Sequence, residues 1–534
     1  MRRWNGWGDD QFHLDLPPQG HQFLSERIGP GQALSDTELA TVCERVPASR
    51  LADHPLIDTS AETRVRHARG QSLPDWLAVR SGDIGVFPDG VAQPKNSDEV
   101  RDLLQYAQRH EITLIPYGGG TSVAGHINPL ADTRPVLTVD MGRMNQLMDF
   151  DPESQIATFG AGTPGPLVES QLRAKGYTLG HFPQSFELST LGGWVASRSS
   201  GQQSLRYGRI EQLFAGGRIE TLQGSLDIPT FPASSAGPDI REMILGSEGR
   251  LGILTEVKVR ATPLADQESF HVTFFPTWEQ ARTAARALVQ SKVQLSMLRL
   301  SNAIETETQL ALAGHPHQIR LLEAYLSFRG AGNQKCMMTF GLTGSRQQCT
   351  AALREARRIC AKQEGVYTGT YLGAKWAEKR FTMPYLREAL WQLGYAVDTL
   401  ETATDWDNVD HLLNRMEGTL RDGLADFGEK VHVFTHLSHF YGQGCSIYTT
   451  YVFRNGSSYA NTLERWKHLK HETSRVIVEN RGTISHQHGV GKDHAPYLPV
   501  EKGELGMRAI HALCQSFDPD RLLNPGTLIR DDKA

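Results

Sequence analysis

The sequence predicts an α+β protein built from two main domains. With 534 residues, the chain has room for about two to four domains of ordinary size. From Gly90 onward a strand, a helix and a second strand follow one another, and the second strand ends in three glycines. After Pro263 the order strand, helix, strand occurs twice, which is typical of an antiparallel sheet covered by helices. We therefore expect a mostly helical segment, two domains and a returning segment, over residues 1–89, 90–265, 266–500 and 501–534.

The composition is that of a soluble globular protein, with 39% hydrophobic and 22% charged residues. The net charge of −5 argues against a nucleic-acid partner. Six cysteines occur without a CxxC pair, which argues against a zinc ribbon or a disulfide framework and favours a reducing compartment. The first residues lack the apolar run of a signal peptide, and no window holds about 18 uninterrupted apolar residues. We expect a cytoplasmic protein without a membrane span.

The first domain begins with a strand, a helix and a strand. The stretch "GVAQP" predicts a short strand, and "SDEVRDLLQYAQRH" predicts a helix over residues 97–110, because its apolar residues recur on one face. Ser97 is the expected N-cap of this helix. The stretch "TLIPYGGG" is then a strand that ends in glycines. The runs "PVLTVD", "QIATFGAG" and "LGILTEVKVRATP" predict further strands up to about residue 262.

The second domain repeats strands and helices. The stretch "ESFHVTFF" predicts a strand, and "TWEQARTAARALVQ" predicts a helix with Thr277 as its cap. "CMMTFGL" predicts another strand, followed by a helix over residues 350–363 with Gly365 as its C-cap. "VYTGTYLG" predicts the next strand. The tail "FDPDRLLNPGTLI" carries turn signals, as expected of a segment that crosses back over the body.

Three glycine-rich stretches are candidates for ligand binding. Residues 116–122, "PYGGGTS", favour a close approach of backbone to a ligand, because successive N–H groups form an anion-binding nest, although a bare turn is the alternative. Residues 184–213 are long and polar for a plain connection, and residues 246–256 lead into a strand. Gly160–Gly165 fits GxGxxG, but its Pro164 and the lack of a suitably spaced acid favour a turn over a dinucleotide site.

Histidines gather in two clusters near the C-terminal end of the second domain. The first cluster holds His432, His436 and His439, and the second holds His486, His488 and His494. On a strand, residues 486 and 488 would point to one face and residue 487 to the other. Such clusters suit a metal site or general acid–base chemistry, and ordinary core or surface histidines are the third interpretation.

Taken in order, these stretches resemble the vanillyl-alcohol-oxidase/PCMH flavoprotein superfamily, and within it the alkyldihydroxyacetonephosphate synthase family. The resemblance runs from "RWNGWG" through "PYGGGTSV", "QSFELSTLGGWVASRSSG", "GPDIREMILGSEGRLGILTE", "LRLSN", "YLRE", "GCSIYTTYVF" and "SHQHGVGK" to "DPDRLLNPG". It implies a PCMH-type FAD-binding domain over residues 90–265 and an antiparallel-sheet and helix substrate (cap) domain over residues 266–500. It also implies a C-terminal segment that returns to the flavin and an FAD held without a covalent bond.

The resemblance places the FAD pyrophosphate on the 116–122 loop and adds three further contact stretches. The implied FAD contacts are Pro116, Tyr117, Gly118, Gly119, Gly120, Thr121, Ser122, Gln184, Ser185, Phe186, Glu187, Leu188, Ser189, Thr190, Ser197, Arg198, Ser199, Ser200, Glu248, Gly249, Arg250, Leu251, Gly252, Ile253 and Leu254.

The chemistry that the resemblance implies is ether synthesis without net redox change. The acyl group of acyl-dihydroxyacetone phosphate is exchanged for a fatty alcohol: a proton leaves C1, the carbon becomes linked to flavin N5, the fatty acid leaves and the alcohol adds. By matching position, Tyr448 is the acid/base and Arg387 clamps the substrate phosphate. Arg299, His486 and His488 match further catalytic positions.

One position departs from the family pattern. Gln487 stands where the family has the middle member of a His-His-His run, and glutamine forms hydrogen bonds but carries no proton at neutral pH. This departure bears on ether synthesis itself.

The alternative within the superfamily is an FAD-linked oxidoreductase of a hydroxylated small molecule such as a D-2-hydroxy acid. Tyr448 and Gln487 stand near the positions where those relatives have metal ligands, and neither suits a metal, so we expect no metal site. A flavin-binding protein without catalysis is a third hypothesis, against which the retained Tyr, Arg and His residues argue. We expect a small-molecule or lipid-phosphate substrate, and we leave a peripheral membrane contact and a homodimer open.

Overall fold

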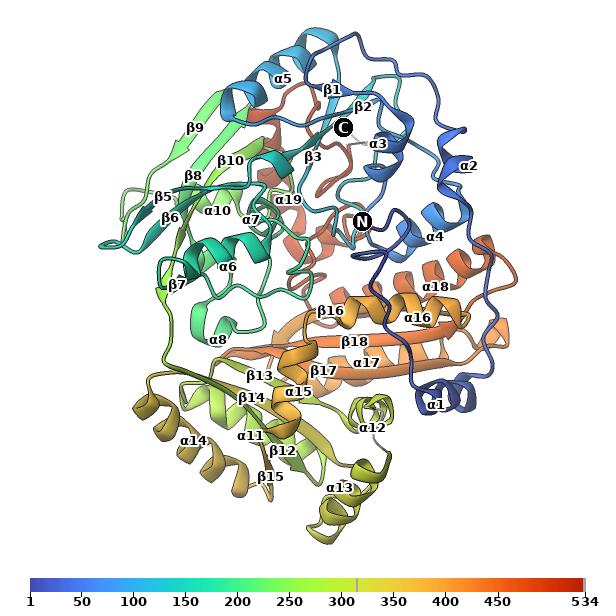
Figure 1. Cartoon of the computed structure of the whole chain (residues 1–534), viewed down its shortest axis with the longest axis vertical. Helices are drawn as coiled ribbons and strands as arrows, with labels where there is room; N and C mark the ends of the chain where they lie inside the picture. The colour runs from blue at the N-terminus through green and yellow to red at the C-terminus, as the bar shows by residue number, and fades with distance from the viewer. Residues whose placement is uncertain (314–315, 532–534) are drawn as a thin grey trace.

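The structure is a computed structural model that describes residues 1–313 and 316–531. Two halves lie one above the other in Figure 1: two small sheets in the upper half and one large sheet in the lower half. Helices and strands mix in both halves, as the α+β class predicts. The boundaries at residues 89, 265 and 500 stay a prediction.

The first small sheet contains the predicted strand–helix–strand unit. It has four strands in the order β1 (Ile57–Asp58), β2 (Gly90–Ala92), β4 (Val136–Asp140) and β3 (Thr113–Tyr117). Strands β2 and β3 both run parallel to β4, which lies between them. Helix α5 (Ser97–His110) joins β2 to β3 and buries Leu103, Leu104 and Ala107. Its cap is Asn96 and not Ser97, because the Asn96 side chain accepts the Glu99 N–H at 2.9 Å.

The second small sheet is antiparallel. Its order is β5 (Leu147–Asp151), β6 (Ile156–Gly160), β10 (Ile253–Arg260), β8 (Phe214–Thr221) and β9 (Gly224–Ile228). Around it lie α6 (Gly165–Arg173), α7 (Leu191–Ser197), α8 (Ser204–Tyr207), α9 (Ile210–Leu213) and α10 (Ile240–Ile244), with the short pair β7 (Tyr177–Thr178) and β11 (Thr262–Pro263). Because β6 belongs to an antiparallel sheet, the GxGxxG match that follows it does not open a Rossmann unit.

The large sheet has seven antiparallel strands. Their order is β15 (Val366–Gly369), β12 (Gln267–Phe275), β14 (Cys336–Gly344), β13 (Met297–Ser301), β17 (Val431–Phe440), β18 (Gly444–Arg454) and β16 (Tyr395–Asp405). The helices of this half are α11 (Trp278–Gln290), α12 (Ala303–Leu312), α13 (Pro316–Phe328), α14 (Arg346–Ala361), α15 (Tyr371–Lys379), α16 (Leu386–Gln392), α17 (Val409–Asp422) and α18 (Tyr459–Glu479). Helices α11, α14 and α17 share one hydrophobic core with the sheet. The sequence predicted a sheet covered by helices, but it did not indicate α17.

Two expectations about helix ends in this half differ in outcome. Thr277 caps α11 as predicted, since its side chain accepts the Gln280 N–H. The predicted helix 350–363 begins earlier and ends earlier, because Ser345 forms a capping box with Gln348. Gly365 lies beyond the helix end, so its assignment as C-cap was wrong: Lys362 occupies that position.

The N-terminal segment touches both halves. It carries α1 (Pro18–Ile28), α2 (Leu39–Cys43), α3 (Ala61–Arg66) and α4 (Leu73–Ser81). Before them, residues 1–10 turn back on themselves, with Arg2 bridged to Asp9. We call residues 1–10 the N-terminal arm. From it, Arg2 donates a hydrogen bond to the Gly119 carbonyl, and Arg3 pairs with Glu388 of α16 at 3.1 Å.

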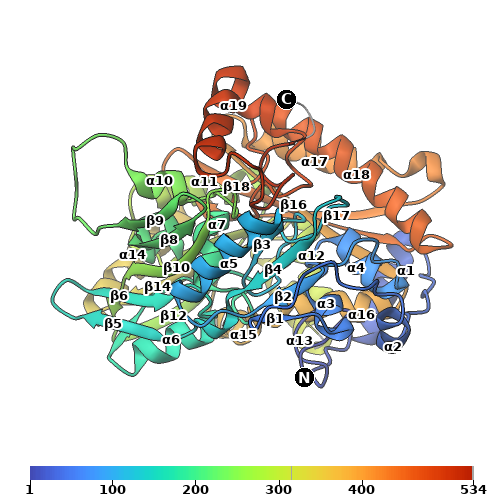
Figure 2. The ribbon, with the colours of Figure 1, turned by 90° about the horizontal axis from the view of Figure 1, so that it is seen from above.

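The C-terminal segment lies against the first sheet. Helix α19 (Leu498–Phe517) is interrupted at Gly503, and the chain then reaches β3, where Leu523 forms a parallel bridge with Leu114. Figure 2 shows α18 and α19 together along one side of the molecule. Over the two described ranges, no helix is long and apolar enough to cross a membrane.

Candidate active site

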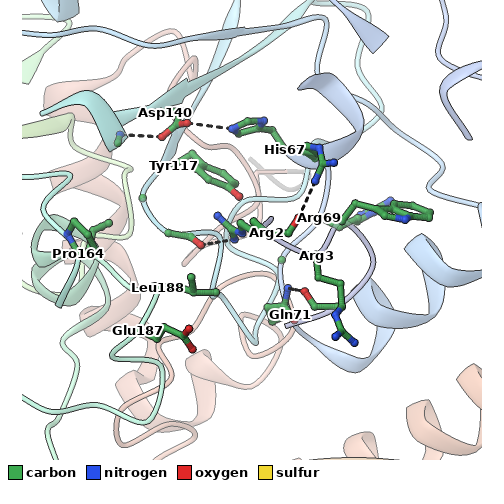
Figure 3. A pocket seen from close by; sticks show the side chains of 18 of the residues that line it. Arg2, Arg3, His67, Arg69, Gln71, Tyr117, Asp140, Pro164, Glu187 and Leu188 are labelled. Atoms are coloured by element: carbon green, nitrogen blue, oxygen red, sulfur yellow. Dashed lines mark hydrogen bonds and ion pairs between the residues drawn. The ribbon is translucent and has the colours of Figure 1, made fainter. Parts of the chain in front are cut away.

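A cavity of about 400 Å³ opens between the N-terminal arm and the two small sheets. This volume falls within the range of cofactor and small-molecule sites, roughly 300–1,000 Å³. Its wall is built from the loop after β3, the end of β4, the turn after β6 and the stretch that precedes α7 (Figure 3). The predicted FAD residues in its lining are Tyr117, Gly118, Gly119, Glu187, Leu188 and Thr190.

The glycines of the 118–120 loop are required by close contact with a second predicted stretch. A Cβ at Gly119 would lie 1.8 Å from the Leu188 carbonyl oxygen, and one at Gly118 would lie 2.3 Å from Thr190 Oγ1. Gly120 has φ +67°, a conformation that side chains disfavour. The loop and residues 188–190 therefore interlock as one wall of the cavity.

Sequence reasoning missed part of the cavity. The lining residues outside the predicted set include Arg2, Arg3, Trp4, Arg66, His67, Arg69, Gln71, Trp76, Asp140, Asn145, Gly162 and Pro164. The glycine turn at 160–165 was predicted as a turn only. It is a turn, and two of its residues also face the cavity, with a Gly162 Cβ only 1.8 Å from the Met141 carbonyl oxygen. The signal was present in the sequence as a second glycine motif in the same domain.

The cavity wall carries cationic side chains that suit a diphosphate. Arg2 lies over the glycine loop and donates to the Gly119 carbonyl at 2.6 Å, beside Tyr117 (Figure 3). Burial lowers the pKa of the Arg69 guanidinium, which is a cost that an anionic ligand offsets. On the opposite side, Asp140 contacts His67 Nε2 at 3.2 Å. The donor set and the glycine wall fit FAD.

Two other predicted FAD stretches lie outside the cavity lining and meet each other. Arg198 has φ +59° and Glu248 has φ +52°, conformations that cost about 1–3 kcal/mol each in non-glycine residues. Glu248 N–H donates to the Ala196 carbonyl, which joins the two stretches. The Arg198 side chain instead pairs with Glu242 at 2.7 Å, and Arg250 holds Asp531 of the C-terminal segment. These two side chains have structural partners here.

The strand register of the large sheet brings Glu401, Tyr448 and His436 side by side. Tyr448 of β18 stands opposite Glu401 of β16 on one side and His436 of β17 on the other. The Tyr448 ring stacks on the His436 ring, with centroids 4.8 Å apart. Its hydroxyl lies 3.3 Å from both Gln184 Oε1 and Thr399 Oγ1. Tyr448 therefore links the large sheet to a predicted FAD stretch.

The Tyr448 phenol is strongly held in its protonated form. Burial, together with the negative charge of Glu401, raises the pKa of Tyr448 to about 12. Tyr448 therefore enters a reaction near neutral pH as a proton donor, and it becomes a base only after its proton has moved to another group.

Glu401 organises the histidine loop after α18. Its Oε1 accepts the backbone N–H groups of His486, Gln487 and His488 at 2.8–3.0 Å, and also the Ser485 hydroxyl at 2.8 Å. These donors and the neighbouring histidines hold the pKa of Glu401 well below its usual value, against the opposing effect of burial. Sequence reasoning did not single out Glu401, because its role depends on cross-strand position.

His486 is fixed as a neutral imidazole. Arg209 Nη1 and the Tyr441 hydroxyl both lie 2.6 Å from its Nε2. Because an arginine can only donate, Nε2 is the acceptor and the ring proton sits on Nδ1, 3.5 Å from Glu401. Burial lowers the pKa of His486, which agrees with this neutral form.

His488 is the more accessible histidine of the loop. Its side chain is 19% exposed, and its Nδ1 lies 3.8 Å from Glu401 Oε1. Its ring meets the Tyr448 ring edge-on, with centroids 5.9 Å apart. Burial is the main cause that lowers its pKa below the usual value. A neutral imidazole therefore lies next to the protonated phenol.

Arg299 belongs to a buried charged group behind Tyr448. Its Nη2 lies 2.6 Å from Glu305 Oε1 and 3.0 Å from His436 Nδ1. Burial raises the pKa of Glu305, but the neighbouring His436 and Arg299 outweigh it and hold that pKa at about 2. Arg299 thus reaches Tyr448 through the stacked ring of His436.

Arg387 of α16 is buried and incompletely paired. Its Nη1 donates to the Gln71 carbonyl at 2.6 Å, and its guanidinium lies 4.6 Å from the centroid of Trp76. Within the described ranges, its Nε and Nη2 have no hydrogen-bond partner. Because Gln71 and Trp76 also line the cavity, Arg387 stands behind that wall.

The side chains of the two histidine clusters have other partners. In the part of the chain that the structure describes, no three His, Cys, Asp or Glu side chains are grouped as metal ligands. The rings of His436 and His488 lie against that of Tyr448, and the rings of His439 and His486 lie against each other. His432 lies apart and hydrogen-bonds to Thr308 at 3.0 Å.

Comparisons with known proteins agree with this architecture. A family model described as FAD binding domain matches residues 88–226, and one described as FAD linked oxidases, C-terminal domain, matches residues 265–528. The chain is 32% identical to the alkyldihydroxyacetonephosphate synthase of Dictyostelium discoideum, over 97% of this chain and 82% of that protein. It is 28% identical to the one of Trypanosoma brucei brucei, over 99% of this chain and 92% of that protein. A solved structure of alkyldihydroxyacetonephosphate synthase matches with a TM-score of 0.84 at 27% identity and covers 98% of each chain. The chain therefore belongs to the alkyldihydroxyacetonephosphate synthase family of FAD-dependent proteins.

Proposed function

We propose that the protein is an FAD-dependent alkyldihydroxyacetonephosphate synthase. It takes acyl-dihydroxyacetone phosphate and a fatty alcohol and gives alkyl-dihydroxyacetone phosphate and a fatty acid. One C–O bond breaks and one forms at the same carbon, so no external oxidant or reductant is needed.

The observation that carries this proposal is the buried, half-paired guanidinium of Arg387. An arginine without an acidic partner is costly to bury, and burial lowers the pKa of this group. The phosphate of the substrate supplies the missing partner, since a guanidinium binds phosphate through two parallel hydrogen bonds. The Gln71 carbonyl and the Trp76 ring hold Arg387 in place before the substrate arrives.

FAD in this proposal is held without a covalent bond by the glycine loop 118–120, residues 187–190 and the arginines of the cavity wall. When bound, it supplies an electron-accepting ring that stabilises the reacting carbon of the substrate.

The protons are handled by the phenol and imidazole beside that site. Tyr448 donates its proton or passes one on, and the neutral ring of His488 receives it. Glu401 keeps the loop of residues 485–488 in place, while Arg209 keeps His486 in one tautomer. Arg299 positions Tyr448 through His436.

The test is a product assay with the FAD-loaded protein. Acyl-dihydroxyacetone phosphate and a labelled fatty alcohol are expected to give labelled ether product and free fatty acid. In parallel, D-2-hydroxy acids are mixed with the protein under anaerobic conditions. Bleaching of the flavin by a hydroxy acid, without ether product, would favour the oxidoreductase alternative and overturn the proposal.

A lipid-phosphate substrate is part of the proposal. The peripheral membrane contact, the homodimer and the cytoplasmic location stay predictions from the sequence.

A further inference from the structure

The histidine loop has a glutamine at its centre. Gln487 lies between His486 and His488, and its backbone N–H donates to Glu401 at 2.8 Å in the same way as theirs. The path of the loop therefore does not depend on the side chain at position 487. The resemblance assigns an imidazole to this position, and glutamine cannot carry a proton at neutral pH.

A histidine from another strand lies next to this loop. His439 belongs to β17, where the pairing with β18 shifts register between Leu437 and Phe440. In this irregular stretch the His439 N–H donates to Ser446 Oγ at 3.1 Å. Such a bulge re-aims a side chain, and the His439 ring lies with its centroid 5.0 Å from that of His486.

The partners of His439 join the loop to a predicted FAD stretch. Its Nδ1 lies 3.2 Å from Ser200 Oγ and 3.4 Å from Ser204 Oγ. Burial lowers the pKa of His439, and a hydrogen bond with the Gln487 side chain raises it in part. The two serine hydroxyls at Nδ1 and the Gln487 amide are all uncharged, so they suit a neutral imidazole.

The charges around His439 keep it neutral. Burial, the His486 ring and Arg209 lower its pKa well below the usual value, and Glu401 and Gln487 oppose them only in part. His439 is 5% exposed, and its side chain has no partner in the reaction described above.

We propose that His439 supplies the third imidazole of the active-site cluster, in place of the one that the loop lacks at position 487, and that Gln487 is its hydrogen-bond partner. This inference rests on the proposed synthase function and deepens it. The His439 ring lies beside that of His486, and it therefore acts on the cluster through His486. His439 is a positioning residue that gives the cluster this third neutral imidazole.

The experiment exchanges the two side chains. Ether synthesis is measured for the FAD-loaded protein and for His439→Gln, Gln487→His and the double variant, with His432→Gln as the control. His432 is a buried histidine of the same strand that lies outside the cluster. We expect His439→Gln to lower kcat by about 10²-fold with FAD content unchanged, because the cluster loses the ring that positions His486. We expect the double variant to regain at least about tenfold of that loss, and His432→Gln to keep the wild-type kcat.

Two results would overturn the inference: equal kcat values for His439→Gln and His432→Gln, or a double variant no more active than His439→Gln. The pH profile of kcat gives a second readout, because loss of a purely structural contact would lower kcat without moving the profile. His439→Asn, which keeps a polar atom near Ser200, serves if His439→Gln does not fold.

Failure of the proposed function gives a different pattern. If the wild-type protein makes no ether product, the synthase proposal fails, and the melting temperatures of the same variants still test the pairing. We then expect Gln487→His to recover part of the melting temperature that His439→Gln loses. Strictly additive losses would show that the two side chains are independent and would overturn the pairing.

Discussion

At the residue scale, we predict that turnover depends most on the hydroxyl of Tyr448. Tyr448→Phe removes only this hydroxyl, and Tyr448 does not line the cavity assigned to FAD. We expect the variant to lose at least about 10²-fold in ether synthesis while keeping its flavin spectrum. Tyr395→Phe is the control, because Tyr395 donates to the Gly29 carbonyl far from the site. Loss of flavin from Tyr448→Phe would mean that this tyrosine is structural.

A second prediction at this scale concerns the stability of a Glu401 variant. Glu401→Gln replaces the carboxylate by an amide. The three backbone N–H groups then share one weaker, uncharged acceptor, and the new NH₂ group lies close to them. We expect the free energy of unfolding to fall by about 2–4 kcal/mol near neutral pH, measured by denaturant unfolding. The depressed pKa of Glu401 stabilises the fold above the unfolded value of about 4.3 and is lost as pH falls through the folded value.

The variant should therefore approach the wild type in acid, since protonated Glu401 makes no charged contacts either. Glu464→Gln, an exposed position on α18, is the matched control and is expected to change little. An unchanged stability for Glu401→Gln at neutral pH would contradict the role assigned to this carboxylate.

Residue identities alone predicted some members of the site and not others. Local stretches that resemble a family predict Tyr448, Arg387, Arg299, His486 and His488. The roles of these residues stay predictions. Glu401 and Arg209 escaped notice, since no local pattern marks them. Arg209 meets His486 across 277 residues of sequence, and only the fold brings them together.

At the scale of elements, the interlocked loops of the cavity wall predict a sharp effect of a single methyl group. In Gly119→Ala the new Cβ would overlap the Leu188 carbonyl oxygen, which is backbone and cannot rotate away. We expect loss of FAD from the purified protein and a lower melting temperature, measured by flavin absorbance and thermal unfolding. Gly418→Ala on α17, where no neighbouring atom lies within 4 Å, is the control. Retention of full FAD by Gly119→Ala would show that the two loops can separate.

Helix and strand patterns in the sequence were reliable guides to the elements, and their ends were not. The periodicity of α5 was correct, whereas the cap lies one residue earlier because the Asn96 side chain accepts the Glu99 N–H. The helix predicted at 350–363 begins earlier in the structure, at Arg346, because Ser345 forms a capping box with Gln348. The turn at 160–165 was recognised, but the sequence could not show that it faces a cavity.

At the scale of the whole molecule, buried neutral histidines predict sensitivity to acid. Burial lowers the pKa of His181 to about 3 and that of His432 to about 4. Between those values and about 6.5, the unfolded chain binds protons that the folded chain does not, so stability is lost as pH falls below about 6.5. Each such histidine lowers the free energy of unfolding by about 1.4 kcal/mol for each pH unit within that window.

Thermal unfolding at several pH values between about 7 and 4 checks this prediction. The melting temperature is expected to fall steadily over that range, and His432→Gln should make the decline shallower. A constant melting temperature down to about pH 5 would contradict it.

For the large sheet, the sequence predicted antiparallel pairing but not the order of the strands. Alternating runs after Pro263 predicted an antiparallel sheet with helices, and this was confirmed. The strand order β15-β12-β14-β13-β17-β18-β16 could not be derived, because strands far apart in sequence become neighbours through burial and connection geometry. A shift of one residue in the β17–β18 register would turn Tyr448 to the other face of the sheet.

The contacts of the C-terminal segment bear on the order in which the protein can be completed during synthesis. Leu522 and Leu523 belong to the core beneath β3, Asn524 binds the Glu248 carbonyl, and Asp531 holds Arg250. Chains grow from the N-terminus, so these contacts to the half with the two small sheets form only after residues 522–531 have left the ribosome. We therefore expect stable uptake of the cofactor only after residues 522–531 have docked, and a chain truncated before residue 522 should remain colourless.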